Sequence, residues 1–438
     1  MKKCFVFFLA NILLSIANAQ TYWQQQVDYT IDVSLNDQEK TLDGFERLVY
    51  TNNSPDTLHF IWFHLWPNAY KNDKTAFSEQ TLQNGDTRFY FSERNQRGYI
   101  NRLDFKVDGT TAQTEDHPQH IDIIKVVLPQ PLLPRQKITI TTPFHVKLPY
   151  NFSRGGYDGQ SFQLTQWYPK PAVYDRKGWH PMPYLDQGEF YSEFGSFDVR
   201  FTVPKAYAVA ATGVLQNEAE KAWLKSRENF LLPPVVKQHK PQPYRSAKAK
   251  PKPVAPALPV TGETKTLHYK QDSIHDFALF ASKEFIVKSD TLQLPSGRIV
   301  NVAAFYTPTY KNTWSESVRY AKAALRFYSA ALGEYPYAVA TVVQGPESFG
   351  GGMEYPTITV LAPTSNAQEL DGLIAHELGH NWFYGILASN ERQHPWLDEG
   401  LNSFYENRYL QSRWGPQSRA AEALFQHKAA NKTDQPIA

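Results

Sequence analysis

The first half of the chain alternates apolar and polar residues with the period of a β-strand. Residues 29–35 show this alternation, and residues 137–141 and 197–203 repeat it. Because successive side chains of a strand point to opposite faces of a sheet, each run predicts a strand with one buried face. Clusters of turn-forming residues separate the runs. From residue 22 to about 212 we therefore predict a large antiparallel β domain.

Helical periodicity begins after Pro308, so we expect the chain to change from β to α near residue 285. Ser365, with Gln368 three residues later, has the pattern of a capping box and predicts the start of a helix. Glycines mark the expected helix ends. In chain order we predict a helix over 315–333, strands over 337–343 and 357–361, a helix over 365–385 and a helix over 395–415.

Residues 233–259 differ in composition from the rest of the chain. They contain eight prolines and six lysines or arginines, and no aspartate or glutamate. Such a segment cannot bury enough apolar surface to order itself. A basic site for an acidic partner is the alternative, but the composition favours a solvated insertion within the β domain.

The first nineteen residues have the pattern of a secretory signal peptide. Lys2 and Lys3 precede an apolar run over 4–14, and small residues at 17–19 form a cleavage site before Gln20. A membrane anchor would need about 20 apolar residues, and no later segment is long and apolar enough to span a bilayer. We therefore expect export to the periplasm or the medium. Cleavage would also remove Cys4, the only cysteine, so we expect no disulfide in the mature protein.

The overall composition limits the classes of function. A chain of 438 residues has room for two to three domains, and its 42% hydrophobic content argues against disorder. The net charge is +2, which gives no support to nucleic-acid binding, because nucleic-acid-binding domains usually carry a basic excess.

The predicted helix over 365–385 carries a candidate metal site. His376 and His380 lie four positions apart, so both imidazoles share one helix face and can reach one metal ion. Histidine nitrogen suits zinc, and a catalytic zinc ion has three protein ligands and one open position. Glu377, next to the first histidine, can take a proton from the bound water. Glu399, 19 positions after His380, is placed to be the third ligand if the chain turns back after the helix.

These residues resemble the gluzincin metallopeptidases, in particular the aminopeptidase N family. The family signature is H-E-x-x-H, eighteen residues, then E, and its second motif, G-x-M-E-N, stands here at 351–355. The resemblance covers nearly all of the mature chain. It implies an α+β protein with a signal peptide at 1–19, an N-terminal β domain at 20–285, and a thermolysin-like, mostly helical catalytic domain at 286–438.

The resemblance also implies roles for single residues. His376, His380 and Glu399 would bind one zinc ion, and Glu377 would be the general base. Glu354 would bind the free α-amino group of a peptide substrate. The backbone of Gly351 and Gly352 would pair with the peptide, and Gln166 would contribute to substrate binding. The implied function is an exported zinc aminopeptidase; the sequence leaves the oligomeric state undefined.

The sequence departs from the family pattern at two positions. Tyr355 replaces the asparagine of the second motif, which leaves the role of Glu354 intact. Relatives have a second anchor for the amine, Gln or Glu, where this chain has Tyr168, which carries no negative charge. This change keeps open a zinc endopeptidase, or a peptidase without strict selectivity for a free amine.

Other interpretations of the motif remain at this stage. The two histidines could be surface residues, and Glu354 could be a solvated residue near a turn. The glycines at 350–352 could form a phosphate loop, but no Gly-Lys-Ser/Thr sequence follows them. A peptide-binding member of the family with weak catalysis is a further possibility, although such a protein need not keep Glu377.

The C-terminal part leads to one more expectation. Relatives use a tyrosine well beyond the third ligand to bind the oxyanion, and Tyr405 and Tyr409 follow Glu399 too closely to match it. We therefore expect the catalytic domain to be incomplete, as in a truncated form or an N-terminal portion of a longer protein.

Overall fold

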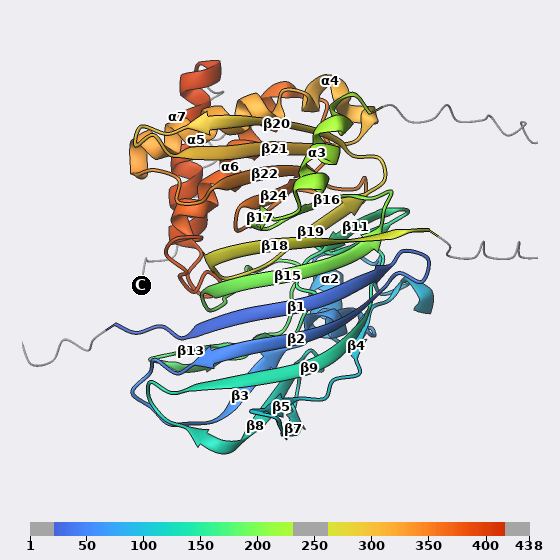
Figure 1. Cartoon of the computed structure of the whole chain (residues 1–438), viewed down its shortest axis with the longest axis vertical. Helices are drawn as coiled ribbons and strands as arrows, with labels where there is room; N and C mark the ends of the chain where they lie inside the picture. Colours follow the sequence, from blue (N-terminus) through green and yellow to red (C-terminus); the bar gives the residue numbers. More distant parts are fainter. Residues whose placement is uncertain (1–21, 231–261, 417–438) are drawn as a thin grey trace, which may run out of the picture.

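The computed structural model describes residues 22–230 and 262–416. The predicted signal peptide (1–19) and the proline-rich insertion (233–259) lie outside these residues. A β-rich region forms one end of the molecule, and a mixed sheet with the longest helices forms the other (Figure 1). No helix in the described part of the chain combines the length and the apolar content needed to cross a bilayer.

The β region is built around a nine-stranded sheet. Its long strands β18, β15, β1, β2 and β9 lie side by side in that order (Figure 1). The strands, in sheet order, are β17 (Val214–Leu215), β18 (Thr264–Ile274), β15 (Gly195–Pro204), β1 (Gln26–Asn36), β2 (Thr41–Thr51), β9 (Lys137–Lys147), β5 (Lys106–Val107) and β6 (Thr110–Thr111), with β4 (Tyr99–Asn101) also paired to β9.

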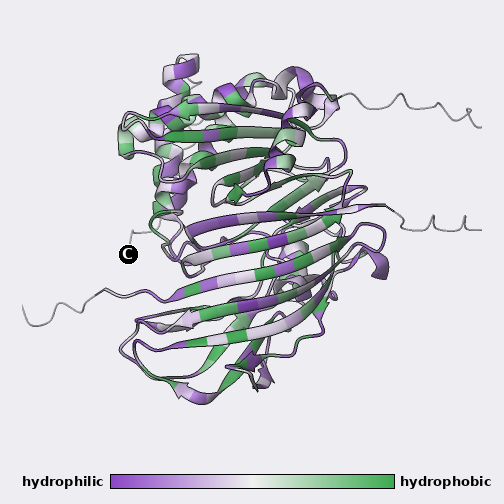
Figure 2. Cartoon of the chain, in the orientation of Figure 1, coloured by the Kyte–Doolittle hydropathy of each residue, from purple (hydrophilic) through white to green (hydrophobic). Residues whose placement is uncertain are grey.

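Alternation of polarity explains these strands. Along β1, every second side chain from Val27 to Leu35 is buried, and β15 shows the same alternation. Figure 2 shows the resulting bands of hydrophilic and hydrophobic colour along the sheet. One ladder departs from the predicted antiparallel domain, because β1 pairs with β15 in parallel, with Tyr29 opposite Phe197. Alternation fixes which face is buried but not the direction of the neighbouring strand.

Smaller sheets complete the β region. One contains β10 (Gly156–Asp158), β11 (Ser161–Leu164), β19 (Leu279–Ser282) and β16 (Ala208–Ala211). A second contains β12 (Lys170–Pro171), β3 (Leu58–His64), β8 (Ile123–Leu132) and β7 (Gln113–Asp116), and a third pairs β13 (Val173–Asp175) with β14 (Gly178–His180). Short helices connect them: η1 (Trp66–Tyr70), α2 (Ala76–Gln83), η2 (Arg94–Gln96), α3 (Glu218–Ser226) and η3 (Arg227–Asn229).

The second region contains a five-stranded mixed sheet. Its order is β20 (Ile286–Gln293), β21 (Ile299–Tyr306), β22 (Val339–Gln344), β24 (Ile358–Leu361) and β23 (Gly352–Tyr355). The three middle strands are parallel, and both outer strands run antiparallel to their neighbours. The expected change from β to α near residue 285 is therefore wrong, since two strands follow it before the first long helix. The boundary between domains at 285 and 286 stays a prediction.

Helices cover this sheet and carry the motif residues. They are η4 (Pro308–Tyr310), α4 (Lys311–Trp314), α5 (Ser317–Leu332), α6 (Ala367–Phe383), the short π-helix η5 (Trp396–Gly400) and α7 (Leu401–Trp414). Helix α5 packs on β20 to β22, and α6 packs on β23 and β24. The predicted capping box is one residue off: the side chain of Asn366, not Ser365, caps α6 by accepting from the backbone N–H groups of Gln368 and Glu369.

A buried carboxylate attaches α7 to α6. Asp371 of α6 is fully buried and accepts hydrogen bonds from the Tyr409 hydroxyl (2.6 Å), the Arg413 guanidinium (3.2 Å) and the Trp414 indole (2.9 Å). Because these bonds satisfy both carboxylate oxygens in the interior, they hold the two helices in one relative position. The Tyr409 hydroxyl is consequently engaged in the contact between the two helices.

Candidate metal centre and active site

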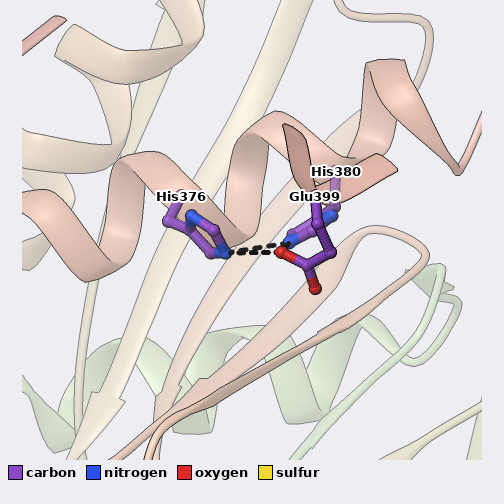
Figure 3. A group of neighbouring side chains, drawn as sticks. All are labelled: His376, His380 and Glu399. Atoms are coloured by element: carbon purple, nitrogen blue, oxygen red, sulfur yellow. Dashed lines mark hydrogen bonds and ion pairs between the residues drawn. The ribbon is translucent and has the colours of Figure 1, made fainter. Parts of the chain in front are cut away.

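Two histidines of α6 bring their Nε2 atoms together. His380 is 2% exposed, and its Nε2 lies 3.1 Å from Nε2 of His376. The spacing of four residues places both rings on one helix face. Glu399 of η5 approaches them from the following segment (Figure 3), with its Oε2 at 3.5 Å from His376 Nε2 and 4.0 Å from His380 Nε2.

Carboxylates hold the opposite nitrogen of each ring. Nδ1 of His380 is 2.6 Å from Oδ1 of Asp398, and Nδ1 of His376 is 3.0 Å from Oε2 of Glu406. An ionised carboxylate can only accept, so each Nδ1 acts as the donor, and a neutral ring then has its Nε2 lone pair free to bind a metal ion. A cation between the two Nε2 atoms would satisfy both lone pairs.

The three ligand atoms fit a zinc ion. Tetrahedral ligands at about 2.0–2.1 Å from zinc lie roughly 3.3 Å from one another, which agrees with the separations of 3.1–4.0 Å seen here. Two nitrogens and one carboxylate oxygen are the donor set of many catalytic zinc sites. The Glu399 side chain is 42% exposed, which leaves access on its side for water and substrate.

The charge around the site also favours a cation. Burial lowers the pKa of His376, but Glu399 and Glu406 outweigh this effect and raise the pKa to about 11. Burial likewise lowers the pKa of His380, and Glu354 and Asp398 raise it to about 10. Both shifts reflect an excess of negative charge, which a divalent cation would neutralise.

A second group, Glu354, His380 and Asp398, also has its donor atoms within 4.8 Å of one another. We favour the first group because His380 already binds Asp398 through Nδ1 by a short hydrogen bond. This hydrogen bond occupies the space between His380 Nδ1 and the Asp398 carboxylate, so a metal ion cannot lie between these two atoms. Asp398 therefore orients His380, as outer carboxylates do at zinc sites.

The structure brings Glu377 against a glycine of β23. A Cβ atom at Gly352 would lie 2.0 Å from Oε1 of Glu377, so only glycine leaves room for this carboxylate. The second oxygen, Oε2, is buried and has no hydrogen-bond partner within the described residues. Burial raises the pKa of Glu377 to about 7, against the lowering effect of His380 and His376. The unpartnered Oε2 leaves this carboxylate with an oxygen free to accept a hydrogen bond or a proton.

Glu354 lies in the same cluster. It is 9% exposed on β23, and its Oε1 finds no partner in the described part of the chain. β23 is the terminal strand of the five-stranded sheet as described, so no further strand of that sheet pairs with its outer edge. Gly351 has a φ of 86°, which suits glycine, and its carbonyl accepts from Ala362 N at 2.7 Å.

Gln166 is not brought to the cluster. It is 3% exposed; its amide nitrogen donates to Asp276 at 2.5 Å, and its amide oxygen accepts from Lys170 at 2.9 Å. Tyr168 is equally buried and donates its hydroxyl to Asp276 at 3.0 Å. Both residues therefore belong to an internal network of the β region.

The sequence interpretation missed the outer carboxylates. Asp398 directly precedes the third ligand, and Glu406 lies seven residues after Glu399, which is two turns along a helix. That helical spacing was the available signal for Glu406.

Comparisons with known proteins agree with this geometry. Residues 317–436 match the model of the Peptidase family M1 domain. Leucine aminopeptidase 2 of Emericella nidulans is 39% identical over 100 residues, which are 22% of this chain and 16% of that protein. Leucine aminopeptidase 2 of Chaetomium globosum is 32% identical over 169 residues, which are 36% of this chain and 27% of that protein. The matches span less than a third of either relative.

Solved structures extend the similarity to nearly all of the fold. An M1 zinc metallopeptidase from Deinococcus radiodurans superposes with a TM-score of 0.55 at 16% identity, over 93% of this chain and 75% of that one. A mutant of an M1 zinc metallopeptidase from the same organism, bound to a Tyr-Ser-Ala substrate, gives a TM-score of 0.56 at 16% identity, over 93% and 75%. The resemblance to the aminopeptidase N family is confirmed, as is a β-rich region followed by a helical, peptidase-like region.

We predict that His380→Ala abolishes tight zinc binding and that Asp398→Asn weakens it about 10–100-fold, the usual effect of losing an outer carboxylate. Competition with a chelator on dialysed, zinc-reloaded protein measures both. His145→Ala is the matched control, because His145 pairs with Asp43 at 2.8 Å on the β region. Unchanged zinc affinity in His380→Ala would show that the metal binds elsewhere.

Proposed function

We propose that this chain carries the catalytic centre of an exported zinc aminopeptidase that removes N-terminal residues from peptides. The observation that supports this most is the arrangement of His376, His380 and Glu399 around one point, next to the unpartnered carboxylate of Glu377. One zinc ion held by the three ligands would acidify water and polarise a substrate carbonyl.

The chain's own residues would do the rest. An extended peptide would pair with the outer edge of β23, where Gly352 allows close approach. Glu377 would accept a proton from the attacking water and return it to the leaving amine. Glu354, with one free carboxylate oxygen, would hold the ammonium group of the substrate and so fix the first peptide bond in place. The Tyr-Ser-Ala complex of the similar metallopeptidase supports a peptide as substrate.

Export is part of the proposal and depends on residues 1–19. Their charged start, apolar middle and small cleavage residues support secretion through a signal peptide. N-terminal sequencing of protein recovered from the periplasm or the medium should begin at Gln20. Recovery of the exported protein with Met1 intact would refute cleavage.

One observation keeps a second candidate function open. Tyr168 stands where relatives have a second acidic or amide anchor, and its hydroxyl is bound to Asp276 in the interior. A zinc peptidase that also accepts blocked N-termini, or cuts within chains, would fit this change. Hydrolysis rates of aminoacyl 4-nitroanilides and of their N-acetyl forms, with and without chelator, separate the two functions.

For the chemistry, we predict that Glu377→Gln keeps zinc and fold but loses about 10²–10⁴-fold in kcat. The amide preserves the size of the side chain and cannot accept a proton from water. Stopped assays together with elemental analysis give both values. A variant with full zinc content and activity within a few-fold of wild type would exclude Glu377 as the base.

For recognition, we predict that Glu354→Ala costs about 2–4 kcal/mol of transition-state stabilisation on substrates with a free amine. The loss should disappear on N-acetylated substrates, which lack the ammonium group. kcat/KM on matched pairs of substrates measures the effect. Glu347→Ala is the control, because Glu347 is an exposed carboxylate seven residues away that accepts a hydrogen bond from the Tyr310 hydroxyl. Equal losses on both substrates would mean that Glu354 only shapes the cleft.

A further inference from the structure

A second buried carboxylate contacts Asp398, the residue that orients His380. Glu391 belongs to the loop between α6 and η5 and is 2% exposed, and Asp398 is fully buried. The two side chains are within hydrogen-bonding reach of each other. Together with the short bond between His380 and Asp398, they form a buried row of three side chains that begins at a candidate zinc ligand.

Each of the two carboxylates has one oxygen without a donor. Oδ1 of Asp398 bonds Nδ1 of His380 at 2.6 Å, but Oδ2 of Asp398 and Oε2 of Glu391 are buried without a hydrogen-bond partner in the described part of the chain. Ionised carboxylates can only accept hydrogen bonds, so two of them cannot satisfy each other. A single proton held by the pair makes one side chain a donor and removes the cost of the unpaired oxygens.

The surroundings favour Glu391 as the holder of this proton. Asp398 already accepts a hydrogen bond from His380, which stabilises its negative charge. Glu391 has no such donor. Burial raises the pKa of Glu391 well above its ordinary value, and the carboxylates of Asp398, Glu354 and Glu189 add to this effect. Glu391 is therefore the neutral member of the pair.

The neighbouring donors do not replace this proton. The Tyr384 hydroxyl donates to a backbone carbonyl at 3.2 Å. Arg392, next in sequence, donates two of its nitrogens to backbone carbonyls at 2.7 and 3.3 Å. Its remaining nitrogen, Nη2, is buried and has no partner among the residues described, so it does not bond Glu391. The donor left for the second oxygen of Asp398 is the carboxyl group of Glu391.

We propose that Glu391 is held as a neutral carboxylic acid whose O–H donates to Asp398 and thereby positions Asp398 behind His380. The proposal rests on the zinc site of the proposed function and adds a positioning residue that neither sequence motif specifies. Asp398 then has one donor on each side, His380 and Glu391, which together fix the orientation of its carboxylate. A fixed carboxylate in turn holds the His380 ring with Nε2 toward the cation.

The test compares three variants with the wild type. Glu391→Gln keeps the size of the side chain and an N–H donor, whereas Glu391→Leu removes the donor and keeps similar bulk. Glu193→Leu is the matched control: Glu193 is also buried, has a raised pKa and has an Oε2 without a partner among the described residues, but it lies in the β region. Competition with a chelator on zinc-reloaded protein measures zinc affinity. Infrared difference spectra of wild type against Glu391→Gln report the protonation state of Glu391.

We expect Glu391→Leu to weaken zinc binding about 10-fold, the lower end of the range for losing an outer partner of a metal ligand. Glu391→Gln should bind zinc as the wild type does, because its amide still donates to Asp398, and Glu193→Leu should do the same. At neutral pH the infrared difference should contain the C=O band of a protonated carboxyl group. If Glu391→Leu fails to fold, the infrared band and the zinc affinity of Glu391→Gln still decide the question.

Three results would overturn the proposal. Equal zinc affinity in wild type and Glu391→Leu would remove the positioning role. A carboxylate band in place of the protonated band would show that Glu391 is ionised. Equal losses in Glu391→Gln and Glu391→Leu would show that the donor is not what matters.

Hydrolysis of aminoacyl 4-nitroanilides by the wild type separates this proposal from the proposed function. If the zinc affinities and the infrared band follow the expectation but no substrate is hydrolysed, the peptidase function fails and the role of Glu391 stands. If the wild type is active and Glu391→Leu binds zinc equally well, only the role of Glu391 fails.

Discussion

The approach of the Nε2 atoms of His376 and His380 to 3.1 Å is the constraint on which the site depends. Each ring is locked in this orientation from behind by a carboxylate, Asp398 for one and Glu406 for the other. Such an arrangement is stable only with positive charge between the rings. The same charge would join α6 to η5 through Glu399, so the cation would act as a cross-link as well as a reagent.

Tight packing supports this cross-link. A Cβ at Gly379 would lie 2.0 Å from Oδ1 of Asn402, and the Asn402 amide donates to the His376 carbonyl at 2.8 Å. Helix α7 therefore lies directly against the ligand helix. Asp371 fixes the far end of the same contact. The positions of the two histidine side chains therefore depend on the packing of α7 against α6.

Several contacts join the β region to the helical region beside the metal cluster. The Tyr384 hydroxyl at the end of α6 donates to the Phe190 carbonyl at 3.2 Å, and Arg392 donates to the Glu189 carbonyl at 2.7 Å. Arg154 of the β region pairs with Glu189 and also contacts Met353, next to Glu354. The candidate zinc ligands belong to the helical region, which these bonds attach to the β region.

The sequence correctly brought His376 and His380 together, because residues four apart on a helix have a fixed relation. It could not place Gln166, whose partner Asp276 lies 110 positions away, because strand alternation gives no information about which strands become neighbours. The parallel pairing of β1 with β15 was missed for the same reason, whereas the burial pattern of each strand was predicted correctly.

That parallel pairing has a consequence for the order in which the strands can pair during folding. β1 and β2 are neighbours in sequence and can pair early as a hairpin. The other edge of β1 has to wait for β15, and β15 in turn pairs with β18, which ends at Ile274. Closing such long loops is slow and costs entropy. Until then the open edge of β1 is free to pair with other chains.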